Sequence, residues 1–168
     1  MGGWFENEVI YSMYVQRFAD ADGDGVGDLE GLTERLEYLA ELGVGCLWLL
    51  PILESPMRDG GYDVSHFYRL DPRIGDFGDL ARFLDRADDF GIRVIKDLPL
   101  NHTSRDHRWF QEARRDPDSP YRDYYIWSDE PDNFADKLIF RGPQTSNWTW
   151  DKEAGQYYYH TFYAHQPD

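Results

Sequence analysis

Apolar residues follow two different spacings along the first hundred positions of the chain. Three short runs, residues 9–15, 44–50 and 92–98, are rich in apolar residues, a pattern typical of buried strands. Between these runs, apolar residues recur three or four positions apart over residues 29–42 and 80–90, which predicts two amphipathic helices. This order of elements predicts an α/β fold that contains three parallel strands.

The two predicted helices end in the same way. Gly43 and Gly91 each stand between a helix and an apolar run, which is the position that a helix C-terminal glycine prefers. Pro51 and Pro99 stand at the ends of the second and third runs, because a proline cannot donate a hydrogen bond to a sheet ladder. Right-handed crossovers bring the carboxyl ends of such strands to one edge, so we expect the loops that follow to gather there.

The pattern changes after the third predicted strand. A short helix is followed by a segment rich in aromatic residues, Pro, Asp and Gly, with strand-like pieces at 137–140 and 156–162. We therefore predict two parts: residues 1–104 hold the first βα units, and residues 105–168 begin an inserted subdomain. A closed (β/α)8 barrel needs about 250 residues. The 168 residues of this chain are expected to be the N-terminal part of such a barrel.

The chain is strongly acidic, with a net charge of −15. This charge argues against nucleic acid and anionic membranes as partners, because both attract basic patches. No stretch approaches the roughly 20 apolar residues of a membrane span, and the first residues do not resemble a signal peptide, so we expect a cytoplasmic location and no membrane partner. Cys46 is the single cysteine, so no disulfide forms within the chain.

Carboxylates stand at alternate positions in the loop after the first predicted strand, residues 20–28. Calcium takes six to eight oxygen ligands, and glycine turns let neighbouring carboxylates converge on one ion. An EF-hand is excluded because its twelfth position would be Gly31 rather than glutamate, and because a strand precedes the loop. The alternative is a solvated acidic turn, but uncompensated carboxylates this close would repel one another, which favours Ca²⁺. The predicted ligands are the side chains of Asp20, Asp22, Asp24 and Asp28 and the backbone carbonyl of Val26.

Polar side chains also follow the second and third predicted strands. Tyr62 and Asp63 come after a Gly-Gly pair, where the ring could stack on a sugar and the carboxylate could accept hydrogen bonds from hydroxyls. Asn101 and His102 end the third run, where the imidazole could donate to a hydroxyl and the amide could ligate a hard cation. The alternatives are an ordinary loop and a pair that caps the next segment. The sequence contains no phosphate-binding loop, serine-nucleophile elbow or zinc-protease motif.

These segments also carry a resemblance in their sequence, order and spacing. They read VIYSMYVQRF at the first strand, DADGDGVGDLEGL in the following loop, WLLPILESP at the second strand, then GGYDVSHF and DLPLNHTS. Together they resemble glycoside hydrolase family 13, the α-amylase family. The later segments WSDEPDNF and TSNWTWDKEAGQYYYHTFYAHQPD are similar to the trehalose synthase branch of that family and to its α-glucosidase relatives.

The resemblance implies a (β/α)8 barrel with a B subdomain inserted after the third strand, and a retaining mechanism on α-glucosidic bonds. It implies that Tyr62 stacks beneath the glucose in the cleaved subsite and that Asp63 and His102 contact its hydroxyls. It also implies calcium in the loop of residues 20–28 and a second calcium-ligand role for Asn101. The chain departs from the family at three positions, since His66, Phe67 and Pro99 replace Asp, Tyr and Val.

The catalytic carboxylates of a retaining enzyme stand about 5 Å apart. The resemblance implies that they come from strands four, five and seven, beyond Asp168, so we expect no turnover from residues 1–168 alone. The favoured function is isomerisation of maltose to trehalose, with a maltose-type sugar or α-glucan as the partner. The alternatives are hydrolysis by an α-glucosidase or α-amylase, and a non-catalytic domain that binds sugar or calcium.

Overall fold

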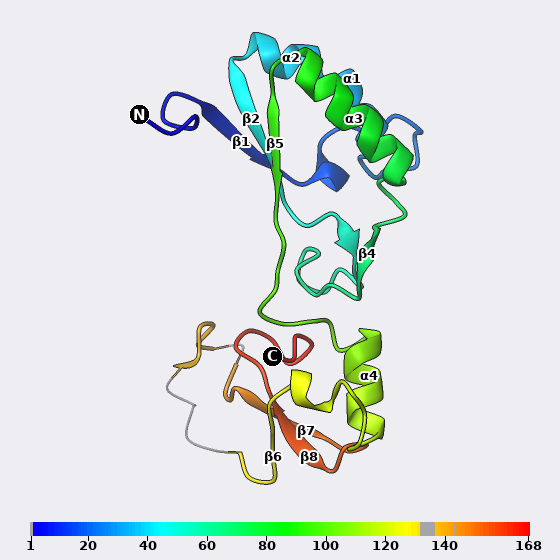
Figure 1. Ribbon diagram of the computed structural model, residues 1–168, viewed down its shortest axis with the longest axis vertical. Helices are drawn as coiled ribbons and strands as arrows, with labels where there is room; N and C mark the ends of the chain where they lie inside the picture. Colours follow the sequence, from blue (N-terminus) through cyan, green and yellow to red (C-terminus); the bar gives the residue numbers. More distant parts are fainter. Residues whose placement is uncertain (1, 132–136, 143) are drawn as a thin grey trace. The chain divides into compact units, whose positions relative to one another are not determined.

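The computed structural model describes residues 2–131, 137–142 and 144–168 (Figure 1). The chain divides into two compact units, each built from two segments. The first unit comprises Met1–Glu54 and Tyr68–Leu98, and the second comprises Ser55–Phe67 and Pro99–Asp168. The division at residue 104 expected from the sequence concerns the subdomains of the longer fold and stays a prediction.

The first unit contains the three predicted parallel strands. They are β1 (Val9–Met13), β2 (Val44–Leu49) and β5 (Arg93–Lys96), arranged in the order β1-β2-β5. Both pairings are parallel, and β1 contains one irregularity in register between its first two residues. The expected α/β arrangement with three parallel strands is therefore confirmed.

The register aligns the carboxyl ends of the strands. Met13, Leu49 and Lys96 lie opposite one another across the sheet. Two further backbone bonds continue this alignment, from Leu50 N to the Met13 carbonyl and from Asp97 N to the Leu49 carbonyl. The chain segments that follow the three strands therefore leave the sheet from one edge, as right-handed crossovers require.

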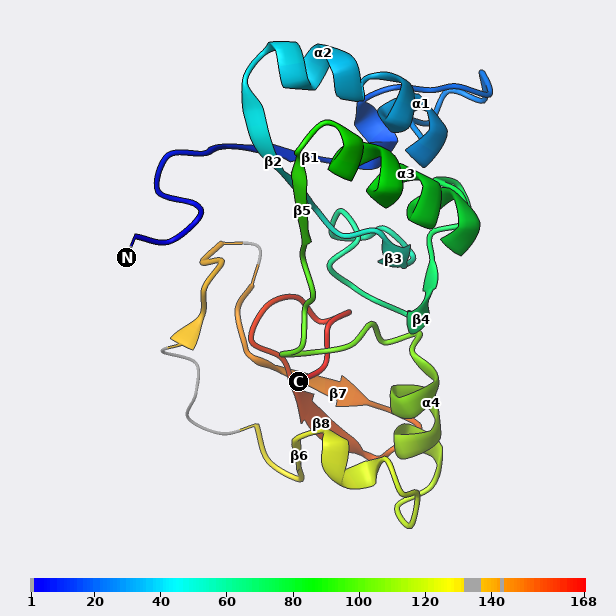
Figure 2. The same ribbon diagram turned by 45° about the horizontal axis from the view of Figure 1, so that its top comes forward.

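Three helices accompany this sheet: α1 (Leu29–Glu34), α2 (Leu36–Glu41) and α3 (Phe77–Asp89). Figure 2 shows them together on one side of the strands. The continuous helix predicted over residues 29–42 is wrong at Arg35, where φ is −98° and ψ is 2° and the helix is interrupted. The Thr33 hydroxyl donates to the Leu29 carbonyl at 2.6 Å, a bond of the kind that bends helices.

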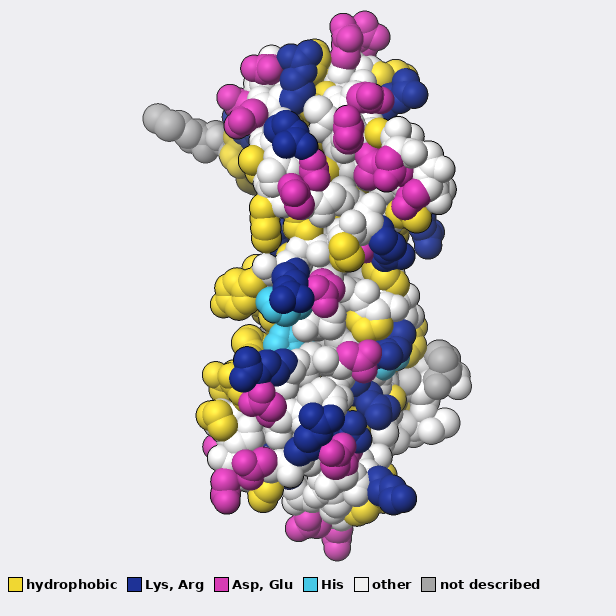
Figure 3. All heavy atoms as spheres, turned by 90° about the vertical axis from the view of Figure 1, so that its right-hand side faces the viewer, with side chains coloured by type: hydrophobic (Ala, Val, Ile, Leu, Met, Phe, Trp, Pro, Cys, Tyr) yellow, Lys and Arg dark blue, Asp and Glu magenta, His cyan; other side chains and the backbone are white. Residues whose placement is uncertain are grey.

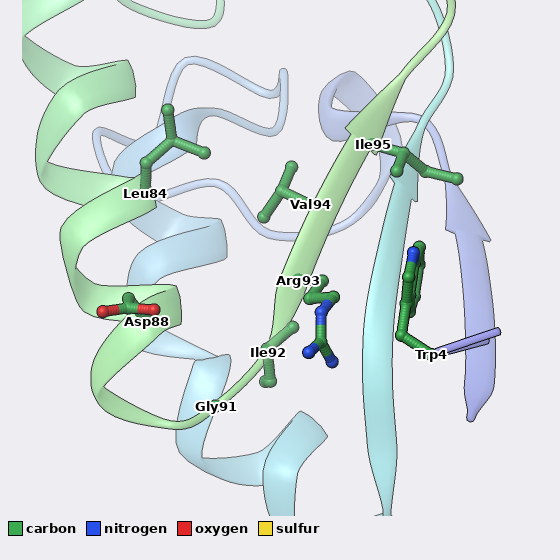
Figure 4. A pocket seen from close by; sticks show the side chains of 8 residues that line it. All are labelled: Trp4, Leu84, Asp88, Gly91, Ile92, Arg93, Val94 and Ile95. Atoms are coloured by element: carbon green, nitrogen blue, oxygen red, sulfur yellow. The ribbon is translucent and has the colours of Figure 1, made fainter. Parts of the chain in front are cut away.

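The core of the first unit lies between the sheet and these helices. Leucines of both short helices and of β2, together with Phe83 of α3, are almost completely buried. Beside β5 lies a cavity of about 490 Å³, into which Val94 and Leu84 project from the strand and from α3 (Figure 4). Apolar residues of β1 remain exposed, including Val9 and Ile10.

A two-stranded sheet of β3 (Leu53–Glu54) and β4 (His66–Leu70) follows β2. The loop between these strands, Ser55–Phe67, packs with the second unit. Several hydrogen bonds attach it there, among them those from Ser104 N to the Val64 carbonyl and from Gln166 to the Asp59 carboxylate.

The second unit combines one helix with an antiparallel sheet. Helix α4 (Arg108–Arg115) is followed by the 3₁₀ turn η2 (Arg122–Tyr124), and the sheet has the order β6-β8-β7. Its core is aromatic, formed by Phe110, Ala113, Tyr125 and Tyr158, so these aromatic residues serve packing. The strand-like piece predicted at 137–140 is wrong, because no strand forms there. The strands are β6 (Trp127–Ser128), β7 (Trp148–Asp151) and β8 (Gln156–Tyr159).

Among the described residues, no helix has the length and apolar character needed to cross a membrane.

Candidate functional site

The second unit brings together the residues predicted to contact a sugar. Tyr62 and Asp63 lie in the loop between β3 and β4, and Asn101 and His102 follow β5 along the chain. Positions 60 and 61 have φ values of 58° and 96°, which glycine adopts without a steric cost. This glycine pair turns the chain immediately before Tyr62 and Asp63.

Asp63 is completely buried, and its carboxylate is held by its own loop. The Ser55 hydroxyl donates to Oδ1 at 2.7 Å, and the backbone N–H groups of Asp59 and Arg58 donate to Oδ1 at 3.4 Å and Oδ2 at 3.3 Å. A carboxylate oxygen accepts more than one hydrogen bond, so Oδ2 keeps capacity for a further donor. No motif in the sequence pointed to Ser55, although its hydroxyl makes the shortest of these three hydrogen bonds to the Asp63 carboxylate.

His102 is 8% exposed and joins two segments of the second unit. Its Nε2 lies 3.1 Å from the Tyr62 carbonyl oxygen, which can only accept, so this bond requires the hydrogen on Nε2. Nδ1 is then an acceptor and faces the Asn101 side-chain amide at 3.5 Å. The edge of the ring also meets Phe162, with centroids 5.3 Å apart. The imidazole therefore has one defined tautomer and a fixed orientation next to Tyr62.

The acidic loop of the first unit brings together three of its four aspartates. Carboxylate oxygens of Asp20, Asp22 and Asp28 lie within 4.8 Å of one another. Asp24 is not in this group, and its carboxylate instead accepts from Val26 N at 2.7 Å.

Backbone N–H groups organise these carboxylates. Asp20 accepts from Gly25 and Gly23 at 2.8 and 2.7 Å, and these bonds lower the pKa of its carboxyl. Asp28 caps α1 through Gly31 N at 2.6 Å and accepts from Ala21 N at 3.0 Å. The donor set is entirely carboxylate oxygen and partly exposed, which fits a hard cation such as Ca²⁺.

Two glycines allow this loop to pack closely against the preceding segment. A Cβ on Gly27 would stand 2.3 Å from the Val15 carbonyl oxygen, and one on Gly31 would stand 2.4 Å from that of Ala19. Backbone atoms cannot move aside as a flexible side chain can. The sequence DGVGDLEG therefore places Asp28 where the chain has no room for larger residues at these positions.

Asp97, the first residue of the segment DLPLNHTS, lies in the first unit. Its Oδ1 accepts a hydrogen bond from the Trp48 indole at 2.7 Å. Asn101 belongs to the second unit, so its predicted calcium role concerns a different part of the structure from the acidic loop.

A buried histidine of the second unit, His107, has a structural role. His107 is the N-terminal cap of α4, and its Nδ1 accepts from Trp109 N at 3.1 Å. Its ring also contacts Phe67, with centroids 5.5 Å apart. Burial, together with the positive potential of His66, lowers the pKa of His107 to about 4. A neutral ring keeps the acceptor that the helix cap requires.

Comparisons with known proteins place the chain in the family that its sequence motifs and its fold indicate. The alpha amylase catalytic domain family matches residues 12–168. A trehalose synthase/amylase of Mycolicibacterium smegmatis is 51% identical over 166 residues, which are 98% of this chain and 28% of that protein. A glucan 1,6-alpha-glucosidase of Streptococcus dysgalactiae subsp. equisimilis is 46% identical over 98% of this chain and 30% of that protein. The chain thus spans less than a third of the length of these relatives.

Solved structures show the same relationship. A MutB mutant in complex with glucose superposes with a TM-score of 0.89 at 38% identity, over 100% of this chain and 30% of that one. Trehalose-6-phosphate hydrolase of Bacillus licheniformis gives a TM-score of 0.89 at 40% identity, over 99% of this chain and 30% of that one. The three parallel strands are the first strands of a (β/α)8 barrel. The chain belongs to glycoside hydrolase family 13, the α-amylase family.

Proposed function

We propose that this chain forms the sugar-binding front of an enzyme acting on α-glucosidic bonds, and that the full-length gene product converts maltose to trehalose. The observation that carries the proposal is the joining of His102 to Tyr62, with Asp63 adjacent, in one unit of the structure. Similarity to the trehalose synthases of Mycolicibacterium smegmatis and Pimelobacter, each 51% identical, supports the choice of reaction.

In this proposal each of the three residues has a separate task. The Tyr62 ring supplies an apolar surface for one face of the glucose. The remaining acceptor capacity of Asp63 Oδ2 receives a sugar hydroxyl, and the His102 ring, held in one tautomer, borders the same hydroxyl groups. Asp63 is completely buried, so the side chains around it must shift before a hydroxyl reaches Oδ2. We place it at the floor of the subsite.

The test is incubation of the full-length gene product with maltose, followed by chromatography of the sugars. Trehalose with little glucose would support the isomerase, because transfer within a closed site excludes water. Glucose alone would contradict isomerisation and support hydrolysis. Residues 1–168 alone, assayed in parallel, are expected to be inactive. We also propose that the protein is located in the cytoplasm.

A hydrolytic alternative is supported by a specific observation. Oligo-1,6-glucosidase of Heyndrickxia coagulans is 41% identical over the whole chain. Isomaltose and longer α-1,6 oligosaccharides should therefore be assayed beside maltose. If all these sugars and longer glucans are inert while glucose still binds, a non-catalytic sugar-binding role gains support and the enzymatic proposal fails.

We further propose that the acidic loop binds Ca²⁺. Asp20, Asp22 and Asp28 would hold the ion, and Ca²⁺ would supply a charge that stabilises the loop rather than a reacting group. Thermal unfolding of the full-length product with Ca²⁺ and with a chelator tests this. An unchanged melting temperature in the two conditions would argue for the solvated acidic turn.

A further inference from the structure

One cavity of the second unit is lined mainly by basic side chains, although the chain carries a net charge of −15. Its volume is about 320 Å³, at the small end of ligand sites. Figure 3 shows several Lys and Arg side chains on the visible face of the second unit. The lining does not include the three proposed sugar contacts. It consists of Arg58, Arg105, Asp106, Gln111, Arg114 and His165.

Two of the three arginines are neutralised by neighbouring carboxylates. Arg58 Nη2 lies 2.7 Å from Asp106 Oδ2, so the one acidic residue of the lining is already engaged. Arg114 Nη2 lies 2.9 Å from Asp151 Oδ2, and its Nε lies 3.4 Å from Glu153. These pairs leave the positive charge of the third arginine uncompensated.

Arg105 is that third arginine. Arg105 is partly buried, and within the described part of the chain its guanidinium has no hydrogen bond and no ion pair. Its backbone, in contrast, is fixed on both sides. Arg105 N donates to the His165 carbonyl at 2.9 Å, and the Arg105 carbonyl accepts from Gln111 Nε2 at 2.7 Å. These bonds hold the backbone in place at the wall of the cavity, and the guanidinium itself offers a planar set of donors that suits an oxyanion.

His165 adds a second unsatisfied group to the same wall. Its Nε2 is buried and has no hydrogen-bond partner among the described residues, while its ring stacks on Tyr163 with centroids 5.3 Å apart. Burial lowers the pKa of this imidazole, which therefore carries one N–H at neutral pH. In the tautomer with hydrogen on Nε2, the imidazole has an N–H donor available for a ligand.

We propose that this cavity binds a small oxyanion of the phosphate class, with Arg105 as the principal contact. Arg58 and Arg114 keep their carboxylate partners and add positive potential, and His165 supplies a neutral donor. The lining contains none of the proposed sugar-contacting residues, but the Arg58 backbone N–H donates to Asp63 Oδ2 at 3.3 Å, so the cavity adjoins them. The proposal does not depend on the proposed reaction. The oxyanion could be inorganic phosphate or the phosphoryl group of a sugar phosphate, because both present the same oxygens to the guanidinium.

The experiment is calorimetric titration of the full-length gene product with inorganic phosphate and, separately, with glucose 6-phosphate. We expect binding that weakens by about tenfold or more in Arg105→Gln, and by less in Arg105→Lys, which keeps the charge but loses the planar donors. Arg108→Gln is the matched control, since Arg108 is exposed on α4, pairs with Glu112 and does not line the cavity. This control is expected to bind like the native protein.

A second measurement uses the unmodified protein and therefore does not depend on the folding of a variant. Phenylglyoxal modifies arginines, and mass spectrometry identifies which ones react. Phosphate should slow the modification of Arg105 and leave that of Arg108 unchanged.

The outcomes distinguish inorganic phosphate from a sugar phosphate as the ligand, and both from a failure of the proposal. Binding of both ligands with equal strength supports a free oxyanion, and tighter binding of glucose 6-phosphate supports a sugar phosphate. The proposal is overturned if neither ligand binds at millimolar concentration. It is also overturned if Arg105→Gln binds as tightly as the native protein and phosphate does not slow the modification of Arg105 by phenylglyoxal.

Discussion

The acidic loop and Asp63 both have carboxylates held by residues a few positions away, but they differ in burial. The acidic loop of the first unit keeps Asp20 and Asp22 exposed and satisfies them with backbone N–H groups only a few residues away. Asp63 of the second unit is buried, and the unit that encloses it comes from two distant segments of the chain. The comparison teaches that a local motif can be recognised from spacing, whereas a buried site depends on contacts that spacing does not reveal.

The largest expected effect comes from changing the buried carboxylate. Asp63→Asn keeps the shape of the side chain but removes its charge, and a hydrogen bond to a charged group contributes about 1.5–3 kcal/mol. If Asp63 contacts the sugar in the transition state, kcat/KM of the full-length product for maltose should fall about 10- to 150-fold.

The matched control for this measurement is Asp89→Asn, which removes an exposed carboxylate paired with Arg86. Exposed ion pairs contribute little, so kcat/KM should stay unchanged. If Asp63→Asn is stable and fully active, Asp63 only organises its loop. The two carboxylate sites would then differ in burial but not in a role in catalysis.

A second change disrupts the acidic loop from within. Gly27→Ala would force a Cβ to 2.3 Å from the Val15 carbonyl oxygen, and overpacking of this kind costs about 1–3 kcal/mol. We expect a lower melting temperature in a thermal unfolding experiment. Gly78→Ala is the control, because its nearest neighbour is the Asp76 side-chain oxygen at 3.0 Å, and it should be close to neutral.

A third change separates the aspartates of the acidic loop. Ca²⁺ at a hundred times its Kd would stabilise the folded protein by about 2.7 kcal/mol. Asp20→Asn should abolish the Ca²⁺-dependent rise in melting temperature, while Asp24→Asn should keep most of it, since Asp24 lies outside the group of three. Equal loss in both variants would assign Asp24 to the ion as well, as its spacing in the sequence predicts.

The last effect concerns the pH dependence of the second unit. The pKa of His107 is about 4 in the folded protein and ordinarily 6.5, so the unfolded chain binds more protons between these values. The contribution of the neutral His107 ring to the free energy of unfolding is therefore complete above pH 6.5. It is lost progressively as the pH falls from 6.5 toward 4.

His107→Asn keeps a side-chain oxygen that can cap α4 and removes the titrating ring. Its melting temperature should therefore vary less over this pH range than that of the native protein. Identical pH profiles would show that His107 is not the group responsible.

Much of the fold could be predicted because the signals are local. Apolar runs and the glycines at positions 43 and 91 locate the helices and the three parallel strands. The break at Arg35 could not be predicted, because leucines continue at helical spacing through it. The error at 137–140 arose in the same way, since a short apolar run does not distinguish a strand from an irregular segment.

The site was predictable only in its residue types. Tyr62, Asp63, Asn101 and His102 could be named from their places after two strands. Their connections could not, because the bond between His102 and the Tyr62 carbonyl joins positions that are 40 residues apart. In the acidic loop, alternate spacing includes Asp24, but local backbone turns direct its carboxylate to Val26 instead.

The hydrogen bond between Asp59 and Gln166 joins residues 107 positions apart, and this has a consequence for synthesis on the ribosome. At about 5–20 residues per second, the loop around Asp63 waits roughly 5–20 s before its last partner emerges. The sheet and helices of the first unit are available earlier. The first unit can thus begin to fold during translation, whereas the neighbourhood of Asp63 forms only after the chain has passed residue 166.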